Sequence, residues 1–300
     1  MRIATLLLRR RLVTAAFVLF AAPAAAQNAT PVTAPADAAT APSPRAPGAL
    51  PIADYARWRS ISSPALSPDG QWMAWSYTQV RQDDELHVKH IDSGREHVVA
   101  RASRPLFSGD GRWVAYSVAP TIKDIDKAEK DKKPVIRRVE LMDLTTGEKV
   151  GWDDATSFAF AETSSHLAVK KNRPEPKPKH EGADLILRDL RNGRDELIGG
   201  VVWHTFNKPG ALLAYATDGA DMDGNGLYLV DLATGTRRTL DNAKAKYTRA
   251  VWSKEGNSLA VLRGVDVDTL ANRANTLVAF TSVKGVTAKR SEIAIGSPKL

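Results

Sequence analysis

The sequence of 300 residues contains no cysteine, which excludes disulfide bonds, thiolate metal sites and a cysteine nucleophile. Long hydrophobic runs are also scarce. The apolar stretch at residues 12–22 is shorter than the roughly 20 residues that a transmembrane helix needs. We therefore expect no stable membrane span.

The sequence motifs of the common catalytic sites are missing as well. No G-x-S-x-G turn is present to hold a serine nucleophile, and no P-loop or dinucleotide-binding fingerprint occurs. The six histidines show no spacing typical of zinc ligands. The sequence therefore assigns no catalytic residue, no cofactor-binding residue and no firm metal ligand.

The formal net charge of +8 gives little indication of a partner. Four basic residues lie within the first 26 residues, which contain no acidic side chain, and without them the net charge falls to +4. No stripe of basic residues interleaved with aromatic ones stands out in the remaining chain. We therefore expect no nucleic-acid binding.

The beginning of the chain has the pattern of a secretory signal peptide at residues 1–26. A basic start precedes the apolar stretch, and three alanines ending at Ala26 provide small side chains for cleavage before Gln27. An uncleaved anchor is the alternative. Residues 27–51 are rich in alanine, proline and threonine, so we expect a disordered linker there. The protein is predicted to be exported, to the periplasm or outside the cell.

One pattern recurs five times in the rest of the chain, at intervals of roughly 40 to 50 residues. Each copy has a large apolar residue before an anchor position and an alanine seven residues after it. A glycine stands three residues after the anchor in four copies, and Ser164 replaces it in the third. The anchors are Ser67, Ser108, Ala161, Asn207 and Ser253. The alanines are Ala74, Ala115, Ala168, Ala214 and Ala260.

Each copy reads as four β-strands. The turn after the anchor reverses the chain, because glycine permits positive φ there. The second strand, for example residues 72–75, is apolar on both faces, which is typical of a strand covered on both sides. The recurring alanine on that strand would let neighbouring layers approach closely. The third strand ends in an Asp-Leu-x-x-Gly turn in three copies, beginning at Asp143, Asp189 and Asp231.

A repeat of this length predicts an all-β fold, a β-propeller of four-stranded blades, over residues 52–300. About five blades are present, which indicates an incomplete ring. An unrelated β-sandwich is the alternative. The expected blades cover residues 60–101, 102–154, 155–200, 201–244 and 245–300.

Two blades carry long insertions between their second and third strands, at residues 120–138 and 170–184. Because both occupy the same connection of the repeat, they should project from the same face of the propeller. Long loops on a rigid scaffold often carry function, although mixed-charge and proline-rich loops are also commonly just solvated.

One loop has the spacing of a calcium site. Asp221, Asp223 and Asn225 place oxygen atoms at alternate positions around glycines, as at the start of an EF-hand loop. The glutamate that would complete such a loop is replaced by Leu232. An ordinary hairpin loop is the alternative, because aspartate, asparagine and glycine are common turn residues.

The export signal, the initial motif Asp-Tyr-Ala-Arg-Trp-Arg-Ser-Ile at residues 54–61, the Ser-Pro-Asp-Gly turn and the Asp-Leu-x-x-Gly turns resemble secreted bacterial peptidases of the prolyl oligopeptidase family. The resemblance covers about residues 52–300. It implies an N-terminal propeller that admits short peptides to a C-terminal α/β-hydrolase domain with a Ser-Asp-His triad. This sequence contains neither that domain nor a position for any catalytic residue of the family.

The resemblance predicts a non-catalytic N-terminal propeller that gates or positions short peptides for a hydrolase domain absent from this sequence. The chain alone should then have no peptidase activity. The alternative is a stand-alone TolB-like periplasmic propeller that binds proteins. A third interpretation is a metal-dependent propeller enzyme, such as a lactonase, with calcium in its central channel.

Overall fold

The structure is a computed structural model that describes residues 54, 57–79, 82–174, 179–267, 273–285 and 287–294. The described residues belong to one compact unit. The predicted signal peptide, the predicted linker and part of the initial motif lie outside the described residues. No helix of the described part is long and apolar enough to cross a membrane.

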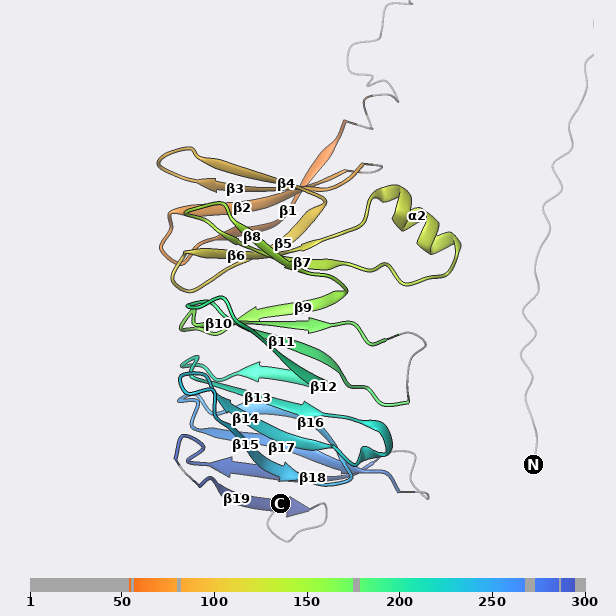
Figure 1. Cartoon of the computed structure of the whole chain (residues 1–300), viewed down its shortest axis with the longest axis vertical. Coiled ribbons are helices and arrows are strands. Elements are labelled where there is room, and N and C mark those ends of the chain that lie inside the picture. The colour runs from red at the N-terminus through yellow and green to blue at the C-terminus, as the bar shows by residue number, and fades with distance from the viewer. Residues whose placement is uncertain are drawn as a thin grey trace, which may run out of the picture. The chain divides into compact units, whose positions relative to one another are not determined.

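The regular secondary structure of the described chain is almost entirely antiparallel strands that pair in sequence order (Figure 1). The first blade contains β1 (Arg59–Leu66), β2 (Trp72–Gln79), β3 (Glu85–His90) and β4 (Glu96–Ala100). The second contains β5 (Ala102–Phe107), β6 (Trp113–Val118), β7 (Arg138–Asp143) and β8 (Lys149–Trp152). The third contains β9 (Ala155–Phe160), β10 (His166–Lys171), β11 (Ala183–Asp189) and the first half of β12 (Asp195–Phe206).

The fourth blade contains the second half of β12, followed by β13 (Leu212–Thr217), β14 (Gly226–Asp231) and β15 (Arg237–Asn242). The fifth contains β16 (Lys246–Trp252), β17 (Ser258–Val265), β18 (Ala274–Thr281) and β19 (Lys289–Ala294). The predicted fold of four-stranded propeller blades is confirmed. The sheets do not close into a ring.

β12 joins the third and fourth blades into one seven-stranded sheet. Its early residues pair with β11, its later residues pair with β13, and Val201 is paired with both neighbours. Gly200, with φ of 70°, lies just before this change of partner. A positive φ also occurs at the links between earlier blades, at Arg101 and Asp154, where the strands are interrupted.

Each pair of successive blades encloses its own hydrophobic core, which gives four cores in the described chain. The second strand of each inner blade contributes to two of them. In β13, Leu213 and Tyr215 pack against the third blade, whereas Ala214 packs against the fifth. The recurring alanine therefore faces the following blade, where its small side chain permits close approach, as the sequence predicts.

The polar anchor side chains close the turn between the first and second strands. Ser108 Oγ accepts a hydrogen bond from Trp113 N at 3.0 Å, and Ser67 Oγ does the same for Trp72 N at 2.9 Å. Asn207 accepts from Leu212 N at 2.9 Å and also donates to Gly256 O of the next blade at 2.9 Å. The turns are thus tied both to their own blade and to a neighbour.

The third copy keeps the turn conformation without glycine. Ser164 has φ of 56°, in the left-handed region that Gly111 and Gly210 occupy at the same position with φ of 68°. Ser164 Oγ accepts a hydrogen bond from Asp110 N of the second blade at 2.9 Å. This contact between blades explains why a serine stands at a position that otherwise favours glycine.

We predict that alanine at Gly256 destabilises the protein more than alanine at Gly70. Both glycines have positive φ, so each substitution costs about 1–2 kcal/mol of backbone strain. At Gly70 the added Cβ meets open space, but at Gly256 it would lie 2.5 Å from Pro209 Cδ and 2.9 Å from Asn207 Nδ2. That clash should lower the free energy of unfolding by about a further 1–3 kcal/mol. Urea unfolding followed by tryptophan fluorescence measures the difference in stability between the two variants. An equal loss of stability in both would contradict the close contact between the turns of neighbouring blades.

Candidate functional site

The first insertion contains a helix that the sequence analysis did not predict. α2 (Ile122–Lys130) begins after Thr121, whose Oγ1 accepts a hydrogen bond from Asp124 N at 3.2 Å. Asp83 of the first blade accepts a hydrogen bond from Ile122 N at 2.8 Å. Figure 1 shows α2 and the first residues after β10 on the same side of the sheets.

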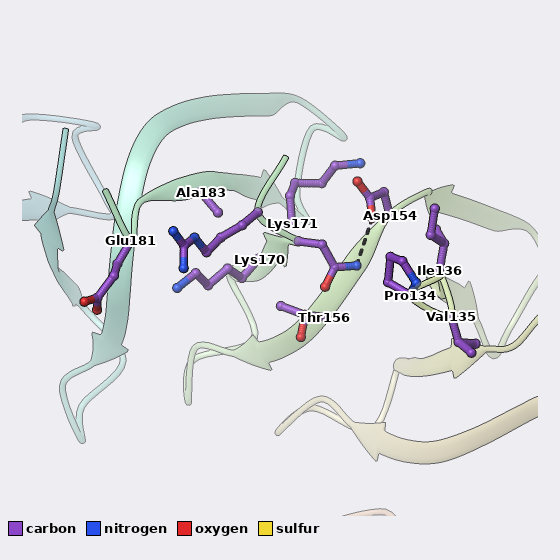
Figure 2. A pocket seen from close by; sticks show the side chains of 11 residues that line it. Pro134, Val135, Ile136, Asp154, Thr156, Lys170, Lys171, Glu181 and Ala183 are labelled. Atoms are coloured by element: carbon purple, nitrogen blue, oxygen red, sulfur yellow. Dashed lines mark hydrogen bonds between the residues drawn. The ribbon is translucent and has the colours of Figure 1, made fainter. Parts of the chain in front are cut away.

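A pocket of about 560 Å³ lies where the two insertions meet, between the second and third blades. Residues of both insertions line it, so the prediction that they project from the same face is confirmed. Figure 2 shows its apolar and charged walls. The first insertion supplies Pro134, Val135 and Ile136. The third blade and its insertion supply Asp154, Thr156, Lys170, Lys171, Asn172, Arg173, Glu181 and Ala183.

The basic side chains of the pocket donate to backbone carbonyls. Lys170 Nζ donates to Val202 O, and Lys171 Nζ donates to Asp153 O. Arg173 donates to His180 O. Among the acidic side chains, Asp154 accepts a hydrogen bond from Asn172 Nδ2 at 2.8 Å, which the dashed line in Figure 2 marks.

The electrostatics of this region disfavour further positive charge. Burial, together with the nearby Arg173 cation, lowers the pKa of Lys170, although Glu181 opposes the shift. The pKa of His204 on β12 is lowered further, to about 4, first by burial and then by the Lys170 cation. His204 is therefore neutral near pH 7, and the positive charge of the site resides on the lysines and Arg173.

Glu181, at the rim of the pocket, belongs to a polar network that reaches the fifth blade. Lys246 Nζ lies 2.9 Å from Glu181 Oε1 and 3.5 Å from Asp218 Oδ2. Burial of Asp218 opposes its ionisation, but hydrogen bonds from Glu181 N and Asn225 and the charge of Lys246 outweigh burial and lower its pKa. Asp218 is thus held as a carboxylate inside the protein.

Two of the three residues proposed for calcium, Asn225 and Asp223, are directed to separate partners. Asn225 is fully buried: its Nδ2 donates to Asp218 Oδ1 and to Ala245 O, both at 2.9 Å, and its Oδ1 accepts from Gly219 N. Asp223 pairs with Lys244 at 2.5 Å, and Asp221 lies in the short η1 (Ala220–Met222). In the part of the chain that the structure describes, no three His, Cys, Asp or Glu side chains converge as a metal site would require.

No protein-family model matches the chain, and no curated protein matches it at a significant level. Solved structures are similar in fold. The β-propeller domain of the trilobed protease from Pyrococcus furiosus is 14% identical, with 79% of this chain and 72% of that chain covered and a TM-score of 0.43. A prolyl endopeptidase is 15% identical, with coverages of 80% and 37% and a TM-score of 0.44. TolB from Acinetobacter baumannii is 13% identical, with coverages of 77% and 56% and a TM-score of 0.36.

The chain thus spans about a third of the prolyl endopeptidase and about half of TolB. Similarity at this level assigns neither an activity nor a partner to this chain. The fold assignment rests on the strand pairing and on the cores between blades.

We predict that Asn225→Ala lowers the free energy of unfolding by about 2–3 kcal/mol, because it leaves buried partners such as Asp218 and Ala245 O without their hydrogen bonds. Asp223→Ala removes only an exposed ion pair and should leave the free energy of unfolding almost unchanged. Unfolding with and without calcium checks both values. A calcium-dependent stability that Asp223→Ala abolishes would instead support the calcium loop.

Proposed function

We propose that the chain is the non-catalytic N-terminal propeller of an exported serine peptidase of the prolyl oligopeptidase type. In this proposal it gates or positions short peptides for a C-terminal α/β-hydrolase domain. The observation that carries the proposal is that both end blades expose faces which the inner blades bury against a neighbour.

The first blade exposes the positions that later blades pack against the preceding blade. Met73 is 40% exposed, whereas Val114 and Leu167 at the same position of the repeat are fully buried. Ile91 is 47% exposed, whereas Leu144 at its equivalent position is buried. The first blade therefore has the apolar face of an inner blade but no preceding blade upon it.

The fifth blade exposes the other kind of face, which the earlier blades pack against the following blade. Ala260 is partly exposed, although the alanines of the four earlier repeats are buried against the following blade. Leu262, Leu277 and Ile293 pair across β17, β18 and β19 and so lie in one row on the same face as Ala260. Leu277 is 36% exposed.

Two open apolar faces at the ends of a repeat array require covering, because terminal repeats of stable arrays normally carry a polar outer face. In the proposed protein, further blades cover them. The alternative is a stand-alone propeller of the TolB type, in which the open faces bind a protein partner. The two proposals predict different gene sequences beyond codon 300, and only the first predicts a hydrolase domain there.

The deciding experiment reads the gene beyond codon 300 and assays the purified chain without residues 1–26 on a short chromogenic peptide. We expect the reading frame to continue through more blades to a G-x-S-x-G turn followed by aspartate and histidine, and no hydrolysis by the present chain alone. Hydrolysis by this chain would overturn the assignment of a non-catalytic domain. A stop codon after Leu300 would favour the binding module.

We also predict that the isolated chain associates through its open faces and that Leu277→Lys raises the fraction of monomer. A buried charge in the contact would disfavour association. Leu197→Lys is the matched control, because Leu197 on β12 is 63% exposed but lies away from both open faces. Light scattering coupled to size exclusion measures the monomer fraction. An equal effect of both substitutions would show that association is nonspecific.

A further inference from the structure

We infer that the open face of the first blade binds the open face of the fifth blade of a second copy of this chain. The two copies meet head to tail, so that the contact continues the array of blades. Head-to-tail contacts join two different surfaces and therefore produce rings or filaments, whereas a symmetric dimer joins two identical ones. The contact needs only these two faces and no hydrolase domain, so it is independent of the proposed function.

Every contact between successive described blades joins two different kinds of face. The earlier blade contributes the face with the recurring alanine, and the later blade contributes the opposite face of its own second strand. Ala74 of the first blade thus shares a core with Val114 of the second. Ala214 of the fourth blade shares a core with Leu259 of the fifth in the same way. The two faces left open at the ends are one of each kind, so they can repeat this contact between copies.

The open face of the first blade has three rows of side chains. Met73, Trp75 and Tyr77 of β2 begin these rows, because Trp72 and Ala74 between them belong to the core with the second blade. Their partners on the neighbouring strands extend the rows with Ile61, Leu66, Glu85, His87, Lys89, Glu96 and Val98. The apolar members are widely accessible, since Ile61, Leu66 and Val98 are 64%, 61% and 49% exposed. A covering surface would therefore bury a large apolar area.

The middle row of this face contains a polar atom that lacks a partner. Trp75 Nε1 is buried and has no hydrogen-bond acceptor among the described residues. Two other tryptophans use the same atom to bond the next blade: Trp152 Nε1 donates to Asp195 Oδ2 at 3.0 Å, and Trp203 Nε1 donates to Tyr247 O at 2.7 Å. Because buried donors normally have an acceptor, the Trp75 indole indicates that a further surface covers this face.

The open face of the fifth blade has the features of such a covering surface. Ala260 provides the small side chain that permits close approach in the other contacts, and Val251, paired with it on β16, is 64% exposed. Hydroxyl groups that can accept from an indole lie on the same face, at Thr281 and Ser291. The face therefore combines apolar surface with acceptors.

The charges on the outer strands of the two faces are opposite. Glu96 on β4 belongs to the open face of the first blade, and Lys289 on β19 belongs to that of the fifth. In the described chain the outer strands of the fourth and fifth blades are joined by an ion pair, between Asp241 and Arg290 at 3.0 Å. A pair of this kind at the edge of the contact would fix the orientation of the two copies more than it would increase their affinity.

The test mixes two variants that each carry a new charge on one open face. Met73→Lys blocks the face of the first blade and Leu277→Lys blocks that of the fifth, and both side chains are partly exposed. Analytical ultracentrifugation of the chain without residues 1–26 measures the mass. Each variant alone should be monomeric under conditions in which the wild-type chain forms species of two or more copies. The mass of an equal mixture should approach twice that of either variant and no more, because one open face of each kind remains.

Leu197→Lys is the matched control and should associate like the wild-type chain, because Leu197 is 63% exposed but lies away from both open faces. Melting temperatures verify that each variant is folded. Dimers of either blocked variant alone would show that like faces meet, which would overturn the proposal. A wild-type chain that is monomeric at every concentration measured, or a mixture that stays monomeric, would overturn it as well. So would a control that loses association.

This experiment and the reading of the gene have separate outcomes. If the mixture forms dimers while the gene encodes no hydrolase domain, the contact between copies stands and the peptidase assignment fails. If the gene encodes that domain and the mixture stays monomeric, only the contact between copies fails.

Discussion

Contact between the small face of one blade and the large side chains of the next supports every other feature of this structure. The recurring alanine presents almost no side chain, so the following blade can approach and bury residues such as Tyr116 and Leu213. Burial of such side chains supplies most of the stability that four-stranded meanders lack in isolation. The turns add hydrogen bonds between blades, for example from Asn207 to Gly256.

The candidate pocket is a product of the same packing. Because the blades are held at close spacing, two insertions that are far apart in sequence project side by side. The first is ordered by the capped helix α2 and by the bond from Ile122 N to Asp83. The second is joined to the fourth and fifth blades through Glu181, Lys246 and Asp218. A rigid scaffold thus positions loop residues that have little hydrophobic contact of their own.

Repetition made the fold predictable from the sequence, since the anchor, turn and alanine positions each carry a local physical requirement. Features that depend on a single contact were not predictable. The helix α2 is short and highly charged and buries none of its side chains, so no core-facing pattern indicated it. Asn225 reads as a calcium ligand by spacing, yet it is buried against Ala245, which lies 20 residues later.

The strand β12 continues from the third blade into the fourth without a break. In arrays where each repeat contacts only its neighbours, local opening usually begins at the ends and proceeds blade by blade. Here the third and fourth blades share β12, and Val201 pairs with both β11 and β13, so parting the two blades at this residue would break one side of its pairing. Lys170 bonds the backbone of this same strand at Val202. The link between these two blades should therefore open less readily than the links at Arg101 and Asp154, where the strands are interrupted.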